Sequence, residues 1–170
     1  MARALRPFAL LALGAATTAG CRSHDPQKEL EVRDVETYWV VDSPKGETQY
    51  ISPAVRFHLR NKSGEPIRSI QATANFKRVG EQENWGSAWE QVTQAGKPLE
   101  AGQEALVVLR SDGRYTSTTD DPESMFKHEL FKDARAEVFV RVGSSNWSKM
   151  AESPIERKIG AHGARDLGAP

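Results

Sequence analysis

Four residues in the middle of the chain have side chains suited to binding. Trp85 and Trp89 lie four positions apart, so on one continuous strand their rings would share a face. The three residues between them are small, and two accessible indoles could stack on a sugar or clamp a peptide. The alternative is that one or both rings fill the core, as large aromatic side chains commonly do. Arg114 and Tyr115 lie in a polar connection and could extend the contact surface, because loops on a rigid framework often carry binding residues.

The same connection holds four acidic residues that could bind calcium, namely Asp112, Asp120, Asp121 and Glu123. Calcium takes several carboxylate and carbonyl oxygens, so a crowd of acids is a necessary feature of such a site. Their spacing is not that of an EF-hand loop, and each acid also has an ordinary use in a turn or a helix cap. The acids therefore do not predict a metal site.

Zinc and nucleophilic chemistry have weaker support. Neither His58 nor His128 has a second histidine or a cysteine at ligand spacing. No serine lies in a Gly-x-Ser-x-Gly elbow. Paired carboxylates for glycoside hydrolysis depend on separation in space, so the sequence leaves that alternative open. We expect a protein that is not an enzyme and has no metal or other cofactor.

Charge limits the class of partner. The 170 residues include 23 Lys and Arg against 23 Asp and Glu, and two of the basic residues, Arg3 and Arg6, precede Cys21. The rest of the chain therefore carries 21 basic and 23 acidic residues. This balance offers no basic face for nucleic acid. It also offers no polybasic patch for anionic lipid.

The first twenty residues have the layout of an export signal. Arg3 and Arg6 precede an uncharged apolar run at 8–16, and small residues follow up to the single cysteine, Cys21. A membrane-spanning helix needs about 20 apolar residues, and this run is roughly half as long. We expect the segment 1–20 to be a signal peptide that is removed.

Small residues at 18–20 lead directly into Cys21, and this arrangement resembles the lipobox of bacterial lipoproteins. The resemblance implies that Cys21 is acylated and becomes the new N-terminus. Arg22, rather than Asp, follows it, which in that family implies the outer membrane, facing the periplasm. The alternative is ordinary secretion with cleavage after Ala19 or Gly20, which would leave a lone exposed thiol in an exported protein.

The remaining chain divides into a tether, a domain and a tail. Residues 21–29 are polar, contain a proline and form the lipidated cysteine and its tether, which fully extended reaches no more than ~26 Å. Residues 30–160 have the length of one domain. Residues 161–170 are expected to be disordered. The folded part should therefore stay close to its membrane.

Alternating apolar and polar residues predict short strands separated by turn residues. About seven such strands indicate an all-β fold, an immunoglobulin-like antiparallel β-sandwich. A continuous apolar run at 106–109 predicts a central strand. One short helix is expected, capped by Asp121, with Pro122 at its first position and Phe126 and Leu130 as an apolar pair. The predicted strands cover 30–41, 55–60, 70–77, 85–92, 106–109, 135–142 and 147–159.

Three segments resemble the FxLYD-type immunoglobulin-like domains of secreted bacterial proteins. The loop 61–66 reads Asn-Lys-Ser-Gly-Glu-Pro after an alternating strand, 72–76 continues a second strand, and 98–103 turns the chain toward a third. The resemblance implies an accessory, non-catalytic domain and carries over no functional residues. We therefore expect an interaction module that holds an envelope protein or a ligand at the membrane. The alternatives are a carbohydrate- or peptidoglycan-binding module using Trp85 and Trp89, and a hydrolytic envelope enzyme.

Overall fold

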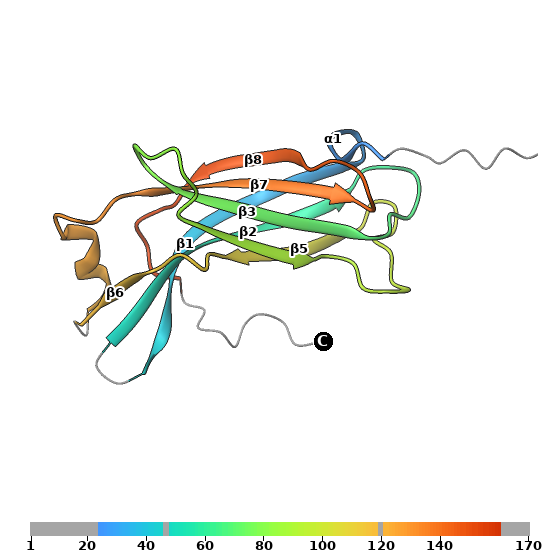
Figure 1. Ribbon diagram of the computed structural model, residues 1–170. Helices are drawn as coiled ribbons and strands as arrows, with labels where there is room; N and C mark the ends of the chain where they lie inside the picture. Colours follow the sequence, from blue (N-terminus) through green and yellow to red (C-terminus); the bar gives the residue numbers. More distant parts are fainter. Residues whose placement is uncertain (1–23, 46–47, 119–120, 161–170) are drawn as a thin grey trace, which may run out of the picture.

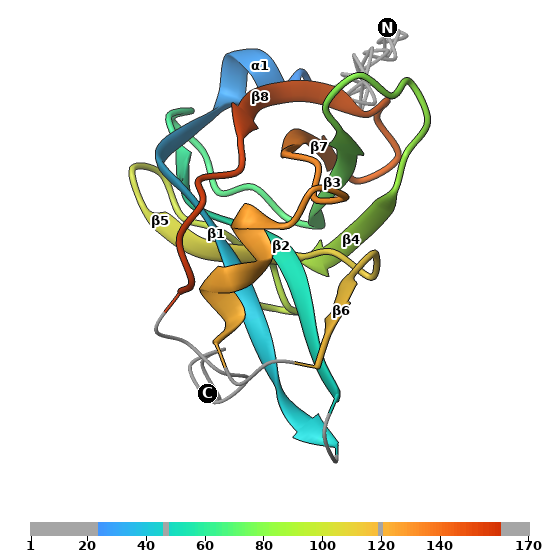
Figure 2. The same ribbon diagram turned by 90° about the vertical axis from the view of Figure 1, so that its left-hand side faces the viewer.

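A computed structural model describes residues 24–45, 48–118 and 121–160. The predicted signal peptide, Cys21 and the predicted tail at 161–170 lie outside these residues. The described chain forms two antiparallel four-stranded sheets that pack face to face, so the predicted all-β sandwich is confirmed (Figures 1 and 2). The fold has eight strands in place of the seven expected.

The first sheet is built on a long hairpin. Its strands are β1 (Leu30–Lys45), β2 (Thr48–Asn61), β5 (Glu104–Arg110) and β6 (Tyr115–Ser117). The order is β1-β2-β5, and β6 pairs with β2 further along, beside residues 49–51. The predicted central position of 106–109 is wrong. Strand β5 pairs only with β2 in its sheet and therefore lies at an edge. Because the sandwich has two layers, each strand has one inner and one outer face, and in β5 Val107 and Leu109 face the core while Leu106 is 55% exposed.

The second sheet has the order β4-β3-β7-β8. Its strands are β3 (Ile70–Arg78), β4 (Gly86–Gln91), β7 (Ala134–Val142) and β8 (Ser148–Pro154). Figure 1 shows β8, β7 and β3 side by side. Strand β8 lies at the sheet edge and ends at Pro154, as its proline and charges predicted. The chain then returns to β1, where Ile159 forms a parallel bridge with Trp39.

The core follows the alternation read from the sequence. Phe57 in β2 and Phe76 in β3 are fully buried, as are their apolar neighbours two positions away on each strand. In β7 every second residue from Ala134 to Val142 is buried. Period-two burial of this kind places one face of each strand against the opposite sheet.

Asn61 closes the loop that follows β2. Its side chain is fully buried; Nδ2 donates to the carbonyl oxygens of Glu65 and Leu99, both at 2.8 Å. Its Oδ1 accepts from the backbone N–H of Ser63 at 2.9 Å and from the Ser63 hydroxyl at 2.7 Å. All four hydrogen-bonding positions of the amide are used. The Asn-x-Ser-Gly-x-Pro pattern is therefore a folded turn that ties the β2–β3 loop to the segment before β5.

Two short helices lie near the two ends of the sandwich (Figure 1). Helix α1 (Pro26–Glu29) precedes β1, and the 3-10 helix η1 (Pro122–Lys127) lies between β6 and β7. Asp121 caps η1 as predicted, with its side chain accepting from the N–H of Glu123 at 3.1 Å. The predicted apolar pair is wrong: η1 ends at Lys127, so Phe126 packs against the core while Leu130 is 72% exposed.

Candidate functional site

Five aromatic side chains gather near the η1 end of the sandwich and are here called the aromatic cluster. Trp39, in β1, is fully buried at its centre. Its ring centroid lies 6.3 Å from Trp85, 5.9 Å from Tyr115, 6.1 Å from Phe126 and 5.3 Å from Phe131. Tilted and edge-on contacts at such distances stabilise aromatic groups beyond the burial of their surface. The cluster therefore joins both sheets to the segment that carries η1.

Two glycines bring Trp85 to this cluster. A Cβ at Gly86 would stand 2.6 Å from the backbone nitrogen of Gly113, and one at Gly113 would stand 2.6 Å from the carbonyl oxygen of Trp85. Only residues without a side chain allow these two backbones to approach so closely. The approach places Trp85 against Tyr115, with 4.9 Å between ring centroids.

Trp85 and Trp89 do not form the predicted pair on one strand face. Strand β4 begins at Gly86, after Trp85, so the alternation that would align the two rings does not extend to Trp85. Trp85 packs in the aromatic cluster, whereas Trp89 is 56% exposed opposite Thr73 of β3. The interpretation of Trp85 as a core residue fits its contacts, and Trp89 remains available to a ligand.

Arg114 is the last residue of the connection between β5 and β6, and Tyr115 is the first residue of β6. The guanidinium carbon of Arg114 stands 4.1 Å from the ring centroid of Tyr50 in β2. This cation–π contact packs Arg114 against the β1–β2 hairpin. The Tyr115 hydroxyl donates to the carbonyl of Lys132 at 3.3 Å and accepts from its N–H at 3.2 Å. Tyr115 therefore fastens the segment after η1 to β6.

An ion pair between Arg157 and Asp133 also holds the segment that follows η1. Arg157 donates twice to the Asp133 carboxylate, at 2.7 and 2.8 Å, and its guanidinium carbon lies 5.4 Å from the centroid of Phe131. Hydrogen bonding to Arg157 lowers the pKa of Asp133. The paired geometry supports the position of Phe131, one wall of the cavity described next.

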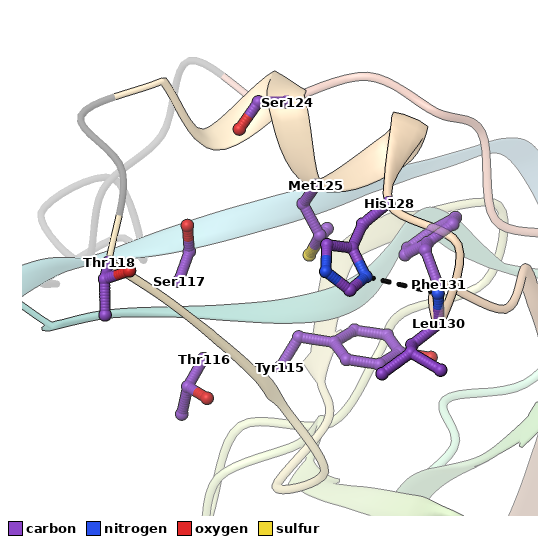
Figure 3. A pocket seen from close by; sticks show the side chains of 9 residues that line it. All are labelled: Tyr115, Thr116, Ser117, Thr118, Ser124, Met125, His128, Leu130 and Phe131. Atoms are coloured by element: carbon purple, nitrogen blue, oxygen red, sulfur yellow. Dashed lines mark hydrogen bonds between the residues drawn. The ribbon is translucent and has the colours of Figure 1, made fainter.

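A cavity of about 320 Å³ opens between β6 and the η1 segment (Figure 3). Figure 3 shows Tyr115, Met125 and Leu130 around the imidazole of His128. His128 Nδ1 accepts from the N–H of Leu130 at 3.1 Å, so Nε2 carries the proton in the neutral ring. The lining combines apolar side chains with hydroxyls and comprises Tyr115, Thr116, Ser117, Thr118, Ser124, Met125, His128, Leu130 and Phe131.

Ser124 on the cavity wall belongs to a Ser-x-x-Lys sequence that ends at Lys127. That spacing occurs in serine hydrolases in which a lysine neighbours the nucleophile. Here the Ser124 hydroxyl donates to the carbonyl of Asp121 at 2.6 Å. This contact is a cap interaction within the first turn of η1.

The acids and histidines weighed as metal ligands are dispersed. Asp112 accepts from the N–H of Ser87 at 2.6 Å, and Asp121 caps η1. His58 Nδ1 lies 3.5 Å from a carboxylate oxygen of Asp34. Within residues 24–45, 48–118 and 121–160, no three His, Cys, Asp or Glu side chains are grouped to hold a metal ion. Asp120 lies outside these ranges.

No family model, curated protein or solved structure matches this chain. In the part of the chain that the structure describes, no helix is long and apolar enough to cross a membrane.

Sequence reasoning missed the centre of the site. The sequence pattern places Trp39 only in the strand predicted at 30–41 and gives no reason to single out Phe131 or Met125. The cavity is formed by residues from two segments that do not share a strand or helix, so no spacing in the sequence points to it. The nearest signal is the density of aromatic residues between Tyr115 and Phe131.

Proposed function

We propose that this chain is a lipid-anchored cell-envelope protein, attached through Cys21, whose β-sandwich is a non-catalytic module that binds a partner protein. The observation that carries the proposal is the cavity beside η1, walled by Tyr115, Met125 and Phe131. It is concave, rigidly backed by the aromatic cluster and rimmed by a few polar groups, which are the features of a binding pocket.

The position of the cavity suits a protein held by its N-terminus. Helix α1 lies near one end of the sandwich and η1 near the other (Figure 1). Strand β1, with 16 residues, runs from α1 past the aromatic cluster to the hairpin tip, a length of roughly 50 Å. An anchor at Cys21 would hold the α1 end near the bilayer, so the cavity would face away from it toward other envelope components.

The cavity fits part of a protein better than a whole large ligand. Its volume of about 320 Å³ is at the lower limit for small-molecule pockets. Anchor side chains of protein interfaces fill pockets of this kind, with a polar rim around them. Leu130, 72% exposed at the mouth, enlarges the apolar surface that a partner could cover.

Site-specific photocross-linking of the full chain in its membranes tests the proposal. A photoreactive phenylalanine at Leu130 should give a discrete adduct with one envelope protein. The same residue at Leu106, 55% exposed on β5, is the matched control and should not give it. Ser117→Trp, on the same face of β6 as Tyr115, should fill the cavity and abolish the adduct. An identical adduct pattern from both positions, or an adduct unchanged by Ser117→Trp, would contradict the proposed site.

A further inference from the structure

The outer face of the β4-β3-β7-β8 sheet has two halves of different chemistry. One half is an ion-pair network: Lys77 and Lys149 bind Glu137 at 2.9 and 3.0 Å, and Arg135 lies 3.5 Å from Glu152. In the other half, polar side chains alternate with aromatic rings. We call this second half the amide–aromatic face; it comprises Gln71, Thr73, Trp89, Gln91, Phe139, Arg141 and Trp147.

Strand register places these residues in two rows across the sheet. Trp89, Thr73 and Phe139 are successive partners from β4 to β7. In the next row Gln91 pairs with Gln71, and Gln71 pairs with Arg141. Their neighbours in sequence on β3 and β7 face the core, so both rows face outward.

Hydrogen bonds fix the polar row in place. Arg141 Nε donates to Gln71 Oε1 at 2.6 Å, and Gln71 Nε2 donates to Gln91 Oε1 at 3.1 Å. The Arg141 guanidinium also stacks on Trp147, with 4.6 Å from its carbon to the ring centroid. Side chains held in this way lose little conformational entropy when a ligand binds.

Two indoles bound the row and remain accessible, Trp89 at 56% exposure and Trp147 at 37%. Both lie on the outer face, near opposite edges of the sheet. They are three strand spacings apart and offset by two residues, a separation of roughly 16 Å. An indole face can stack on the C–H face of a pyranose ring, and planar amides and guanidinium groups hydrogen-bond adjacent sugar hydroxyls. The separation suits a ligand several rings long.

Charge on this half of the sheet favours an acidic ligand. Arg141 is bonded to a neutral amide, and among the described residues it has no carboxylate partner, in contrast to the paired cations of the other half. The row continues into a cavity of about 380 Å³ that is lined by Gln71 and Gln91 and by two more cations, Arg68 and Lys97. These cations, too, form no ion pair within the described chain.

We infer that the amide–aromatic face binds a linear glycan whose pyranose units carry carboxylate groups. Sugar rings stack on Trp89 and Trp147, the second N–H of the Gln71 amide binds a hydroxyl, and Arg141, Arg68 and Lys97 attract the carboxylates. The Gln91 amide orients Gln71, because both of its own N–H groups donate to the carbonyls of Ile70 and Thr93. This site is separate from the cavity beside η1 and does not depend on the partner protein proposed for it.

Titration calorimetry of the full chain in detergent tests the inference. The probes are polygalacturonate, alginate and peptide-free peptidoglycan strands, with dextran as the neutral comparison. At least one carboxylated probe should bind more tightly than dextran, and Trp89→Ala and Trp147→Ala should each weaken it about tenfold. Because both indoles are exposed, the variants should keep the wild-type melting temperature, and Trp89→Phe should retain part of the affinity.

Arg141→Gln and Arg135→Gln form the matched pair, since both arginines lie on the outer face of β7 and only Arg135 has a carboxylate partner. Arg141→Gln should reduce the preference for the carboxylated probe, and Arg135→Gln should leave it unchanged. The inference is overturned if no carboxylated probe binds, if dextran binds as tightly, or if binding survives both tryptophan substitutions. Loss of the Leu130 cross-link with intact glycan binding would count only against the partner-protein site.

Discussion

Asn61 should be one of the most costly polar residues to replace. Asn61→Ala removes four hydrogen bonds from a fully buried side chain. The carbonyl of Leu99 keeps the bond from the N–H of Ile67 but loses its second, buried one, which costs about 0.5–1.5 kcal/mol. The bonds to Glu65 and Ser63 lie nearer to water and contribute about 0.5–1.5 kcal/mol each. We expect the free energy of unfolding to fall by about 3 kcal/mol.

The chain has a matched control in Asn84, an exposed residue of the β3–β4 connection. Asn84→Ala should change stability by less than about 0.5 kcal/mol. Thermal unfolding followed by circular dichroism should place the midpoint of Asn61→Ala about 10 °C below the wild type. Equal midpoints for the two variants would refute the assignment of the buried amide as the anchor of this loop.

Asn61→Asp separates hydrogen bonding from size. The carboxylate keeps the shape and the acceptor oxygen but cannot donate to the carbonyls of Glu65 and Leu99. The destabilisation should exceed that of the alanine variant at pH 7, because a charge is buried against two carbonyl oxygens. It should shrink at pH 4, where a protonated carboxyl can donate again. A loss of stability independent of pH would argue against this account.

Three further predictions concern Tyr115, Glu137 and Cys21. Tyr115→Phe removes both bonds to Lys132 and should cost about 1 kcal/mol in urea unfolding while weakening the Leu130 cross-link; an unchanged adduct would mean that this hydroxyl does not position the cavity. Hydrogen bonds from Lys77, and to a smaller extent from Lys149, lower the pKa of Glu137 from its ordinary value of 4.5. The ionised Glu137 therefore stabilises the fold above pH 4.5, and this contribution is lost as the pH falls through the lowered pKa of the folded protein. Glu137→Gln should therefore lose less stability than the wild type between pH 7 and pH 3, and equal losses would contradict this. Cys21→Ser should move the folded protein from the membrane pellet to the soluble fraction, and continued pelleting would refute acylation.

The regular strands could be predicted because their signal is local. In β2, β3 and β7, burial alternates with the same period as the side chains, so the apolar pattern of each segment alone identifies its inward face. The cap of η1 was equally local, since Asp121 and Pro122 act on the first turn. Leu106 shows the limit of such reasoning. A continuous apolar run predicts burial on both faces, and only the two-layer packing of the sheets shows that the outer face of β5 is open.

The candidate sites depended on contacts between distant segments. Sequence determined that Trp85 and Trp89 are large aromatic groups near a strand, and it predicted the sandwich that carries them. The tertiary structure decided their different positions, because the approach of Gly86 to Gly113 turns Trp85 into the aromatic cluster and leaves Trp89 on the sheet. Register then brought Trp89 into one outer face with Arg141, which lies 52 positions further along the chain. Such juxtapositions arise from long-range strand pairing, which local periodicity does not encode.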